Sequence, residues 1–288
     1  MNNYTVAILG PATIDKIVHR NQSEWQLGGV VAYAGITFKR LGINTVVVTN
    51  VAEKDISILD SLRNEGIHLF RGDSKNTAEF INYIIGNDRR QEMPQAADPI
   101  KLDQLKTLID MVDHLHLGPL QPNDFDLDLL EFIKLTKLRT SLDVQGYIRS
   151  TRKNRVIKYA SKNLSSALSC SQIIKGDEEE ISLILNFYKT SITELMHRFN
   201  IMEIIITDGF RGGRIKTNGG GEICYNAKPI NSFVDSTGAG DVFFAAYIMF
   251  HFYEGRNIVE ASEMAAKLAA EQIEGKHILK KILRLKHS

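Results

Sequence analysis

The chain has 288 residues, enough for one large α/β domain or two small ones. Its 35 Lys and Arg residues nearly balance 34 Asp and Glu residues, so no strongly basic field predicts nucleic acid or an anionic membrane as a partner. Two cysteines, Cys170 and Cys224, are too few for a disulfide framework and indicate a reducing compartment.

The first ten residues, MNNYTVAILG, are typical of a first β-strand and not of a signal peptide. The longest apolar run, residues 242–250, is far shorter than the roughly 20 residues that span a bilayer. We therefore expect a cytoplasmic protein.

Short strands alternate with helical patterns along the chain. Several of the strands carry nearly continuous apolar residues, as strands buried on both faces do. The predicted strands are 4–9, 44–51, 112–118, 139–144, 170–175 and 202–207, and the predicted helices are 31–41, 101–111, 126–136, 177–188 and 258–273. This alternation predicts an α/β fold with a parallel sheet covered by helices on both faces.

Two segments, 15–27 and 76–93, break this rhythm because they alternate apolar with polar residues. They predict exposed strands of a small antiparallel sheet that stands off the main body. Trp25 and Phe80 then form either its packing face or an exposed adhesive surface, and packing is the commoner arrangement. The sequence contains no evident linker or repeat, so we expect residues 1–288 to form a single domain.

The stretch FVDSTGAGDVFF, residues 233–244, places Gly238, Ala239 and Gly240 before Asp241 at the head of a predicted helix. A helix start gathers free backbone N–H groups and the positive end of the helix dipole, so it attracts an anion. Phosphoryl transfer requires such donors together with an acid that takes the proton of the acceptor hydroxyl. An ordinary helix start, with an Asp that the dipole favours, is the alternative.

Other motifs fit this stretch poorly. A Walker loop needs Lys and Ser or Thr after the last glycine, and a dinucleotide fingerprint needs a third glycine where Phe243 stands. The pair His114 and His116 shares one face of a predicted strand, which is more typical of a strand end than of a metal site.

Residues 235–243, DSTGAGDVF, resemble the C-terminal signature of the ribokinase-like (PfkB) carbohydrate kinases. Further landmarks of that family follow in the expected order, so the resemblance covers essentially the whole chain. They are GPATID ending at Asp15, GGVVAYAG with Gly28 and Gly29, KGDEEE with Lys175 and Glu180, and TDGFRGG with Thr207, Gly209 and Gly212. The resemblance implies a three-layer sandwich around a mostly parallel sheet, with segments 15–27 and 76–93 as a β-lid that often also forms a dimer surface.

The resemblance also implies roles for these residues. Asp241 would be the base and the Gly238-Ala239-Gly240 turn the anion hole. The other implied roles are sugar binding by Asp15, Gly28 and Gly29, nucleotide binding by Lys175, Thr207, Gly209 and Gly212, water-mediated Mg²⁺ binding by Asp177 and Glu180, and a monovalent cation such as K⁺ at Asp235. Each residue also has a structural alternative, such as a turn cap at Asp15 or a solvated first helical turn at Asp177 and Glu180.

The chain departs from the family pattern at three points. Tyr33 stands where the N-terminal signature usually has Asn, so the resemblance does not carry the sugar contacts of that Asn over to this chain. Asp177 replaces the Asn of the family's acidic motif and adds negative charge near the metal. Residues 264–276 lack the Asn often seen near the adenine pocket.

For the substrate, LDVQGYIR (142–149) with HLGPL (116–120) most resembles myo-inositol kinases and related polyol or sugar-acid kinases. Gln145 and Arg149 would then reach ring hydroxyls, although Arg149 could instead be a surface charge. We expect an ATP- and Mg²⁺-dependent kinase of a small neutral sugar or polyol. The alternatives are a nucleoside kinase and a non-catalytic binding protein, and the intact turn with Asp241 favours an enzyme.

Overall fold

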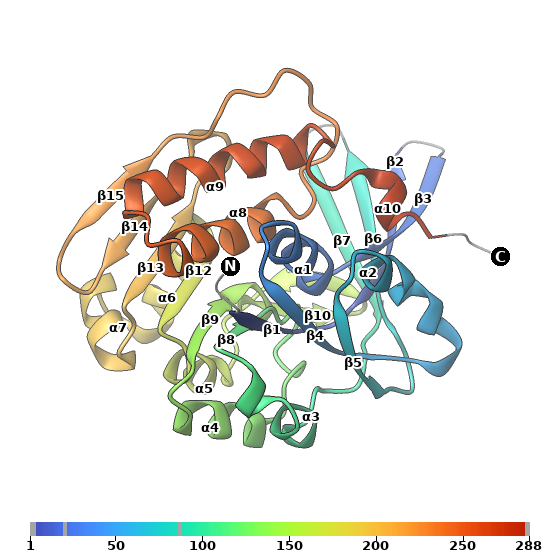
Figure 1. The fold of residues 1–288 in the computed structure, drawn as a ribbon, viewed down its shortest axis with the longest axis horizontal. Helices are drawn as coiled ribbons and strands as arrows, with labels where there is room; N and C mark the ends of the chain where they lie inside the picture. The colour runs from blue at the N-terminus through green and yellow to red at the C-terminus, as the bar shows by residue number, and fades with distance from the viewer. Residues whose placement is uncertain (1–3, 20–21, 86–87, 286–288) are drawn as a thin grey trace.

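The computed structural model describes residues 4–19, 22–85 and 88–285, and within them two β-sheets (Figure 1). The larger sheet runs in the order β15-β14-β13-β12-β9-β8-β1-β4-β5. Strands β13 to β5 of that order pair in parallel, and β14 and β15 add an antiparallel edge. The bounds are β1 Thr5–Leu9, β4 Asn44–Val51, β5 His68–Asp73, β8 His114–Leu117, β9 Arg139–Asp143, β12 Ile173–Asp177, β13 Glu203–Thr207, β14 Gly213–Thr217 and β15 Glu222–Tyr225.

Strand β1 shows why both faces of this sheet are covered. Val6 and Ile8 belong to one hydrophobic cluster and Ala7 and Leu9 to another, and all four are fully buried. The first cluster packs under α1 Val30–Arg40, α2 Asp60–Asn64, α8 Ala239–Ile248, α9 Ile258–Ile273 and α10 Lys280–Leu283. The second packs under α3 Leu102–Lys106, α4 Leu127–Leu135, α5 Leu164–Ser169, α6 Glu178–Tyr188 and α7 Ile192–Phe199. The predicted three-layer sandwich is confirmed.

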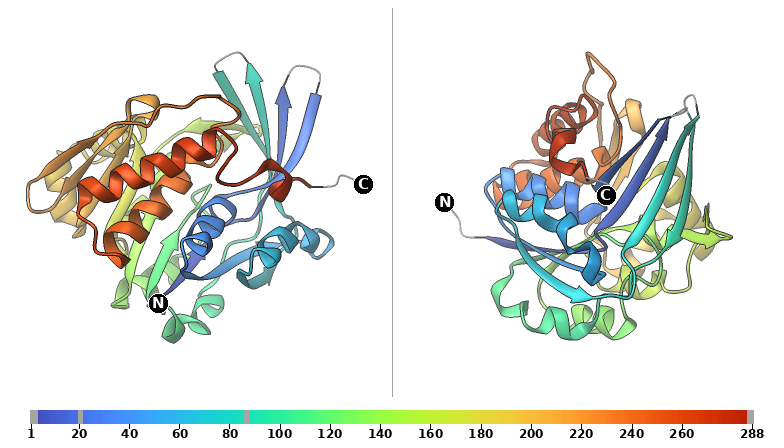
Figure 2. Two further views of the ribbon diagram at one scale, coloured as in Figure 1. Left: turned by 45° about the horizontal axis from the view of Figure 1, so that its top comes forward. Right: turned by 90° about the vertical axis from the view of Figure 1, so that its right-hand side faces the viewer.

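The second sheet stands beside these layers, and its long strands project from them (Figure 2). Its order is β10-β11-β7-β6-β2-β3. The bounds are β2 Thr13–His19, β3 Gln22–Gly28, β6 Ala78–Ile85, β7 Asp88–Gln95, β10 Arg149–Arg152 and β11 Arg155–Lys158. The C-terminal residues Arg284 and Leu285 pair with the β3 edge at Gln26 and Trp25. Phe80 is buried, and Lys16 lies over the half-buried ring of Trp25, so both aromatic residues serve packing.

The second sheet differs from the small antiparallel sheet that we predicted. Strands β2 and β6 pair in parallel, because the chain crosses the large sheet between them. Strands β10 and β11 were not predicted, since both are short and rich in charge. Their two-residue turn, Lys153–Asn154, has positive φ at both residues, which matches the twist of a tight hairpin.

The large sheet and its helices also depart from the prediction in places. Strands β5, β14 and β15, at or next to the edges of the sheet, were missed because they lack a continuous apolar run. The predicted helix 101–111 is divided into α3 and a 3-10 turn, Ile109–Met111. The Thr107 hydroxyl donates to the Gln104 carbonyl there and so competes with the helical hydrogen bond. No helix in the described part of the chain is long and apolar enough to cross a membrane.

Candidate active site

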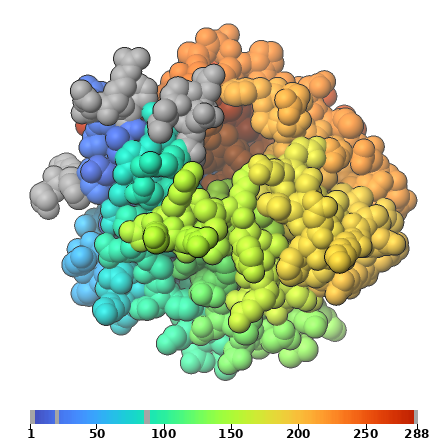
Figure 3. All heavy atoms as spheres, turned by 180° about the vertical axis from the view of Figure 1, so that it is seen from behind, coloured from blue at the N-terminus to red at the C-terminus, as the bar shows by residue number. Residues whose placement is uncertain are grey.

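Two cavities meet at the start of α8, and the polar one lies between the two sheets. Figure 3 shows the molecule hollowed between the teal strands of the second sheet and the yellow-to-orange C-terminal half. The polar cavity, of about 190 Å³, has Asp15, Lys175 and Asp241 in its walls. The apolar cavity, of about 340 Å³, lies between the turn after β13 and helices α8 and α9. Ser236 and Gly240 line both, so the cavities join at the glycine-rich turn.

The glycine-rich turn forms the N-terminus of α8. Gly238 precedes the helix with a φ of 77°, a conformation that favours glycine. A Cβ on Gly238 would lie only 2.1 Å from Cδ1 of Tyr33, so the Tyr33 ring packs directly on this turn. Ala239 and Gly240 are the first helical residues, where backbone N–H groups lack intrahelical partners, although the Ala239 N–H donates to the Ser236 carbonyl at 3.2 Å. Asp241 follows in the first turn and faces the polar cavity.

Asp15 lies in the polar cavity on β2 and is only 6% exposed. The Thr13 hydroxyl donates to its Oδ1 at 2.6 Å. Gly28 lies against the same carboxylate, because a Cβ there would be 2.3 Å from Asp15 Oδ2. Gly29 lines the cavity with a φ of 87°. A Cβ on Gly29 would lie 2.2 Å from the Pro11 carbonyl oxygen, so neither glycine position has room for a side chain.

Lys175, which the resemblance assigns to the nucleotide, lies in the wall of the polar cavity. Its Nζ donates to Asp143 Oδ2 at 2.6 Å and lies 3.1 Å from the position of a Cβ on Gly240. Burial alone would lower the pKa of Lys175, but the charges of Asp143, Asp241 and Glu180 raise it above its ordinary value. A permanently charged ammonium therefore lies beside both Asp241 and the turn. Sequence reasoning missed Asp143, whose signal is a carboxylate at the carboxyl end of a buried strand.

The remaining polar walls come from the second sheet and the segment that leads into it. Gln145 follows β9, and its backbone N–H donates to Asp143 Oδ1 at 3.1 Å. Arg149 begins β10 and donates to Gln91 Oε1 on β7 at 3.1 Å. Gln91 and Tyr33 also line the cavity and were not predicted to do so. Arg149 is thus half-buried at the site and is not a surface charge.

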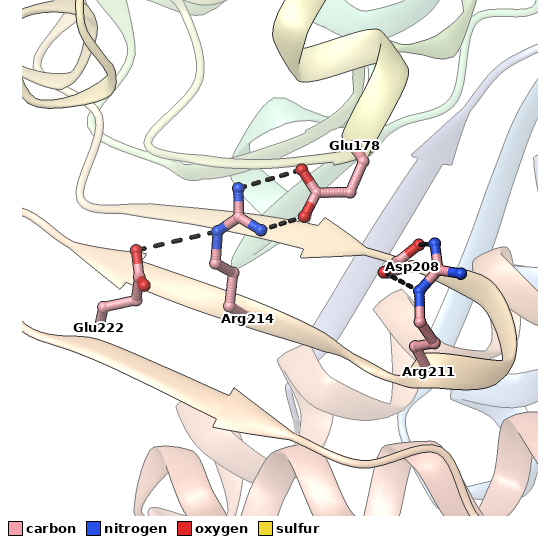
Figure 4. Close-up of polar contacts among 5 residues, drawn as sticks. All are labelled: Glu178, Asp208, Arg211, Arg214 and Glu222. Atoms are coloured by element: carbon pink, nitrogen blue, oxygen red, sulfur yellow. Dashed lines mark hydrogen bonds and ion pairs between the residues drawn. The ribbon is translucent and has the colours of Figure 1, made fainter.

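Thr207, Gly209 and Gly212, predicted to bind a nucleotide, all line the apolar cavity. The turn that carries them is tight, and a Cβ on Gly212 would lie 2.1 Å from the Tyr225 carbonyl oxygen. Figure 4 shows two bidentate ion pairs beside it: Arg211 with Asp208 at 2.6 and 2.7 Å, and Arg214 with Glu178. The second pair joins β14 to the first residue of α6. The first pair braces the turn internally, and the second ties the strand that follows it to α6.

Asp177 and Glu180, the residues predicted near a metal, form the cap of α6. Asp177 Oδ1 accepts from the Glu180 N–H at 2.7 Å, and Glu180 Oε2 accepts from the Asp177 N–H at 2.9 Å. Burial, followed by the charge of Asp143, raises the pKa of Glu180. Across residues 4–19, 22–85 and 88–285, no three acidic, histidine or cysteine side chains gather as a metal site would require.

Asp235 and the histidine pair also have structural partners. Asp235 Oδ1 accepts from the N–H and the hydroxyl of Thr237, at 2.9 and 2.7 Å, beside a small cavity that Tyr33 also lines. His114 and His116 both hydrogen-bond to the Ser141 hydroxyl, at 2.7 and 2.8 Å. Burial lowers the pKa of His116 to about 3, which keeps the ring neutral. The histidines are core groups between β8 and β9.

The fold matches solved structures of kinases. A pyrophosphate-dependent kinase of the ribokinase family, complexed with a pyrophosphate analogue and myo-inositol, is 22% identical, with 93% of this chain and 95% of that chain covered and a TM-score of 0.81. Ribokinase from Thermotoga maritima is 17% identical, with coverages of 97% and 96% and a TM-score of 0.75. A nucleoside kinase from Methanocaldococcus jannaschii is 17% identical, with 96% of both chains covered and a TM-score of 0.74. The fold is therefore that of the ribokinase family.

A family comparison identifies the class of enzyme. Residues 15–278 match the pfkB family of carbohydrate kinases, whose members are phosphotransferases that act on a hydroxyl group. The chain belongs to this family. No curated protein matches the sequence at a significant level.

Proposed function

We propose that the protein is an ATP-dependent kinase that phosphorylates a hydroxyl group of a small neutral polyol or sugar, myo-inositol or a related compound. One observation carries the proposal: a polar cavity containing Asp15 and Asp241 meets an apolar cavity at the Gly238-Ala239-Gly240 turn. The acceptor would occupy the polar cavity and the nucleotide the apolar one. The phosphoryl group would cross between them at Gly240.

Asp241 is the general base in this proposal. Its carboxylate accepts the proton of the acceptor hydroxyl while that oxygen bonds to the γ-phosphorus and the bond from phosphorus to the ADP oxygen breaks. A positioned base of this kind contributes about 10²- to 10⁴-fold to the rate. The N–H groups at the start of α8 stabilise the transferring phosphoryl oxygens, since they point out of the helix at its positive end.

Besides the positive end of α8, the Lys175 ammonium contributes a positive charge at the point of phosphoryl transfer. Its ammonium lies against Gly240 and is held by Asp143, so it is oriented before the donor arrives. We therefore assign Lys175 to the moving phosphoryl group rather than to the nucleoside. A fixed charge in a site that excludes water stabilises developing negative charge more strongly than a solvated one.

Asp15 orients the acceptor. With Thr13 donating to one of its oxygens, the carboxylate is fixed, and it accepts hydrogen bonds from ring hydroxyls. Gln91, Gln145 and Arg149 add donors and acceptors around the same space. A cavity of about 190 Å³ with such walls suits a compact, many-hydroxyl molecule.

A nucleoside acceptor is the second candidate. An adjoining cavity of about 220 Å³ shares Leu120 and Arg149 with the polar cavity and also contains Met93 and Val156. That space would take a base while the sugar occupies the polar cavity.

ATP rather than pyrophosphate is the proposed donor, because the apolar cavity offers hydrocarbon walls that pyrophosphate has no group to fill. Asp177 and Glu180, which line neither cavity, would contact Mg²⁺ through water, because carboxylate oxygens are ligands of the kind Mg²⁺ prefers. When bound to the phosphates, Mg²⁺ neutralises charge on the leaving group. Asp235 is the proposed carboxylate for K⁺, and replacing KCl by tetramethylammonium chloride in assays tests it.

Two further proposals concern the molecule in the cell. We place it in the cytoplasm, and we propose a homodimer through the second sheet, acting as a lid over the acceptor. Sedimentation velocity of the wild type and of Ile157→Glu, at an exposed position on that sheet, tests the dimer. A monomeric wild type would contradict it.

An ADP-release screen with Mg-ATP over inositols, pentoses, hexoses, keto acids and nucleosides tests the function. We expect turnover with an inositol or neutral sugar and none with Asp241→Asn protein. Turnover with nucleosides alone would establish the second candidate. ADP release with none of these acceptors would overturn the assignment of the polar cavity.

A further inference from the structure

One exposed phenylalanine lines the apolar cavity, and a second lies against its ring. Phe210, in the turn after β13, lines the cavity and is 69% exposed. Phe233, in the connection from β15 to α8, is 60% exposed, and its ring centroid lies 6.4 Å from that of Phe210 with the planes tilted by 58°. Neighbouring large apolar side chains in water often mark a binding surface.

The connection that carries Phe233 is anchored to α9. The N–H groups of Val234 and Asp235 donate to the Ile273 carbonyl, at 3.0 and 3.1 Å. The turn that carries Phe210 is held by the Asp208–Arg211 pair (Figure 4). The connection that carries Phe233 is therefore tied to α9, and the turn that carries Phe210 is braced by an ion pair within itself.

The interior of this cavity is largely hydrocarbon. Its walls along the connection and α9 are Ile230, Ala266, Ala269, Ala270 and Ile273. Polar side chains lie elsewhere on its rim. Ser236 is at the junction with the polar cavity, and Lys228 has its Nζ 3.8 Å from Glu263 Oε2.

Two further polar side chains also have defined positions. Thr207 is the last residue of β13, paired in the sheet with Asp177. The Tyr225 ring stacks on Phe243 at 4.8 Å, and its hydroxyl points toward Gly213 of β14. A base in this cavity would thus meet apolar faces and methyl groups along most of its outline.

We propose that Phe210 and Phe233, whose rings contact each other, present one apolar surface, here called the aromatic clamp, that covers the base at the cavity and selects the donor by the stacking area of that base, so that the enzyme uses ATP and GTP alike and disfavours pyrimidine nucleotides. This inference rests on the proposed nucleotide donor. Adenine and guanine present the same bicyclic face and differ only in the polar groups at their edges. Cytosine and uracil present a single ring and cover less of the two phenyl groups.

Calorimetric titration with ADP, GDP, CDP and UDP tests the clamp without an acceptor. We expect dissociation constants for ADP and GDP within about 5-fold of each other. Complete loss of a stack on a base costs about 1–3 kcal/mol, which is roughly 5- to 150-fold in affinity. Pyrimidine nucleotides keep part of the stack, so they should bind more weakly than ADP by a factor inside that range, and binding of CDP and UDP as tight as that of ADP would contradict the proposal. GDP binding 100-fold weaker than ADP would overturn the proposal.

Substitutions test whether the purine preference comes from the rings of Phe210 and Phe233. Phe210→Ala and Phe233→Ala should each weaken ADP and GDP by the same factor, within the range just given, and should reduce the purine preference. Phe210→Trp should retain it. Phe187→Ala, which removes a 49% exposed ring on α6 away from the cavities, is the matched control and should change nothing. Because both clamp rings are exposed, melting temperatures should stay at the wild-type value.

An assay with pyrophosphate as the donor distinguishes failure of the clamp from failure of the proposed function. Turnover with pyrophosphate and no binding of any nucleoside diphosphate would overturn both the ATP assignment and the clamp. If the enzyme turns over with ATP and neither Phe210→Ala nor Phe233→Ala changes the KM for ATP, the clamp alone is overturned.

Discussion

The two cavities are built in opposite ways. The polar cavity joins residues from Thr13 to Asp241, contributed by both sheets and by α1 and α8, and its walls carry buried charges that hold one another in place. The apolar cavity comes from residues 207–273 alone and is shaped by glycines, alanines and aromatic rings. A buried charge has a large effect when its partner is removed, whereas shape is shared among many weak contacts. Single substitutions should therefore act far more strongly in the polar cavity.

Removing the charge of Lys175 should have the largest effect. Lys175→Met leaves Asp143 buried without its partner, which typically costs about 3–5 kcal/mol of stability. Urea unfolding measures this loss. The matched control is Lys158→Met, which breaks an ion pair whose side chains are 44% and 67% exposed and should cost less than about 1 kcal/mol. Equal losses in both variants would contradict the contrast between buried and exposed charge.

Replacing the base should abolish most turnover and leave binding intact. Asp241→Asn should lower kcat by at least about 100-fold, because the acceptor oxygen keeps its proton during attack. Steady-state kinetics measure kcat, and calorimetry with ADP checks that the donor still binds. Asp110→Asn, an exposed acid in a 3-10 turn, is the control. Near-normal turnover of Asp241→Asn would exclude Asp241 as the base.

Replacing Asp15 should weaken binding of the acceptor and leave binding of the donor unchanged. Loss of a charged hydrogen-bonding partner costs about 1.5–3 kcal/mol, so Asp15→Ala should raise the acceptor KM roughly 10- to 150-fold. The affinity for ADP should not change, since Asp15 lies in the polar cavity only. If ADP affinity falls and the acceptor KM does not, the two cavities have exchanged roles.

The smallest effect concerns Asp124, in the loop that brings Leu120 to the polar cavity. Burial raises the pKa of Asp124 to about 6, although the N–H groups of Leu120 and Gln121 donate to it at 2.6 and 3.0 Å. A carboxyl group whose pKa is higher in the folded than in the unfolded state binds a proton more tightly when folded. Its contribution to stability therefore increases as the pH falls from about 8 to 5, by about 1.4 kcal/mol.

Urea unfolding of wild type and Asp124→Asn at both pH values measures the contribution of Asp124. The difference in stability between the two proteins should change by that amount, because asparagine does not titrate. A constant difference would mean that Asp124 has an ordinary pKa.

The sequence by itself determined the layered core. Continuous apolar runs predicted β1 and β4, and the three- and four-residue spacing predicted α9 over residues 258–273 with the bounds observed. The glycine-rich turn before Asp241 was also predicted at the start of a helix, where α8 begins. These features depend on local periodicity and on the backbone freedom of glycine, which neighbouring residues in the chain suffice to specify.

Only the tertiary structure decided which residues share a cavity. Lys175 was expected with the nucleotide residues but lies in the wall of the polar cavity. There it donates to Asp143, which is 32 positions away in the chain. Tyr33 and Gln91 join the same cavity from α1 and β7; the N-terminal signature marked the position of Tyr33 only as a departure, and no local pattern marked Gln91. Strand crossovers and packing of the second sheet on the first bring these side chains together. Such contacts depend on how distant segments pack, which residue type and spacing along the chain do not specify.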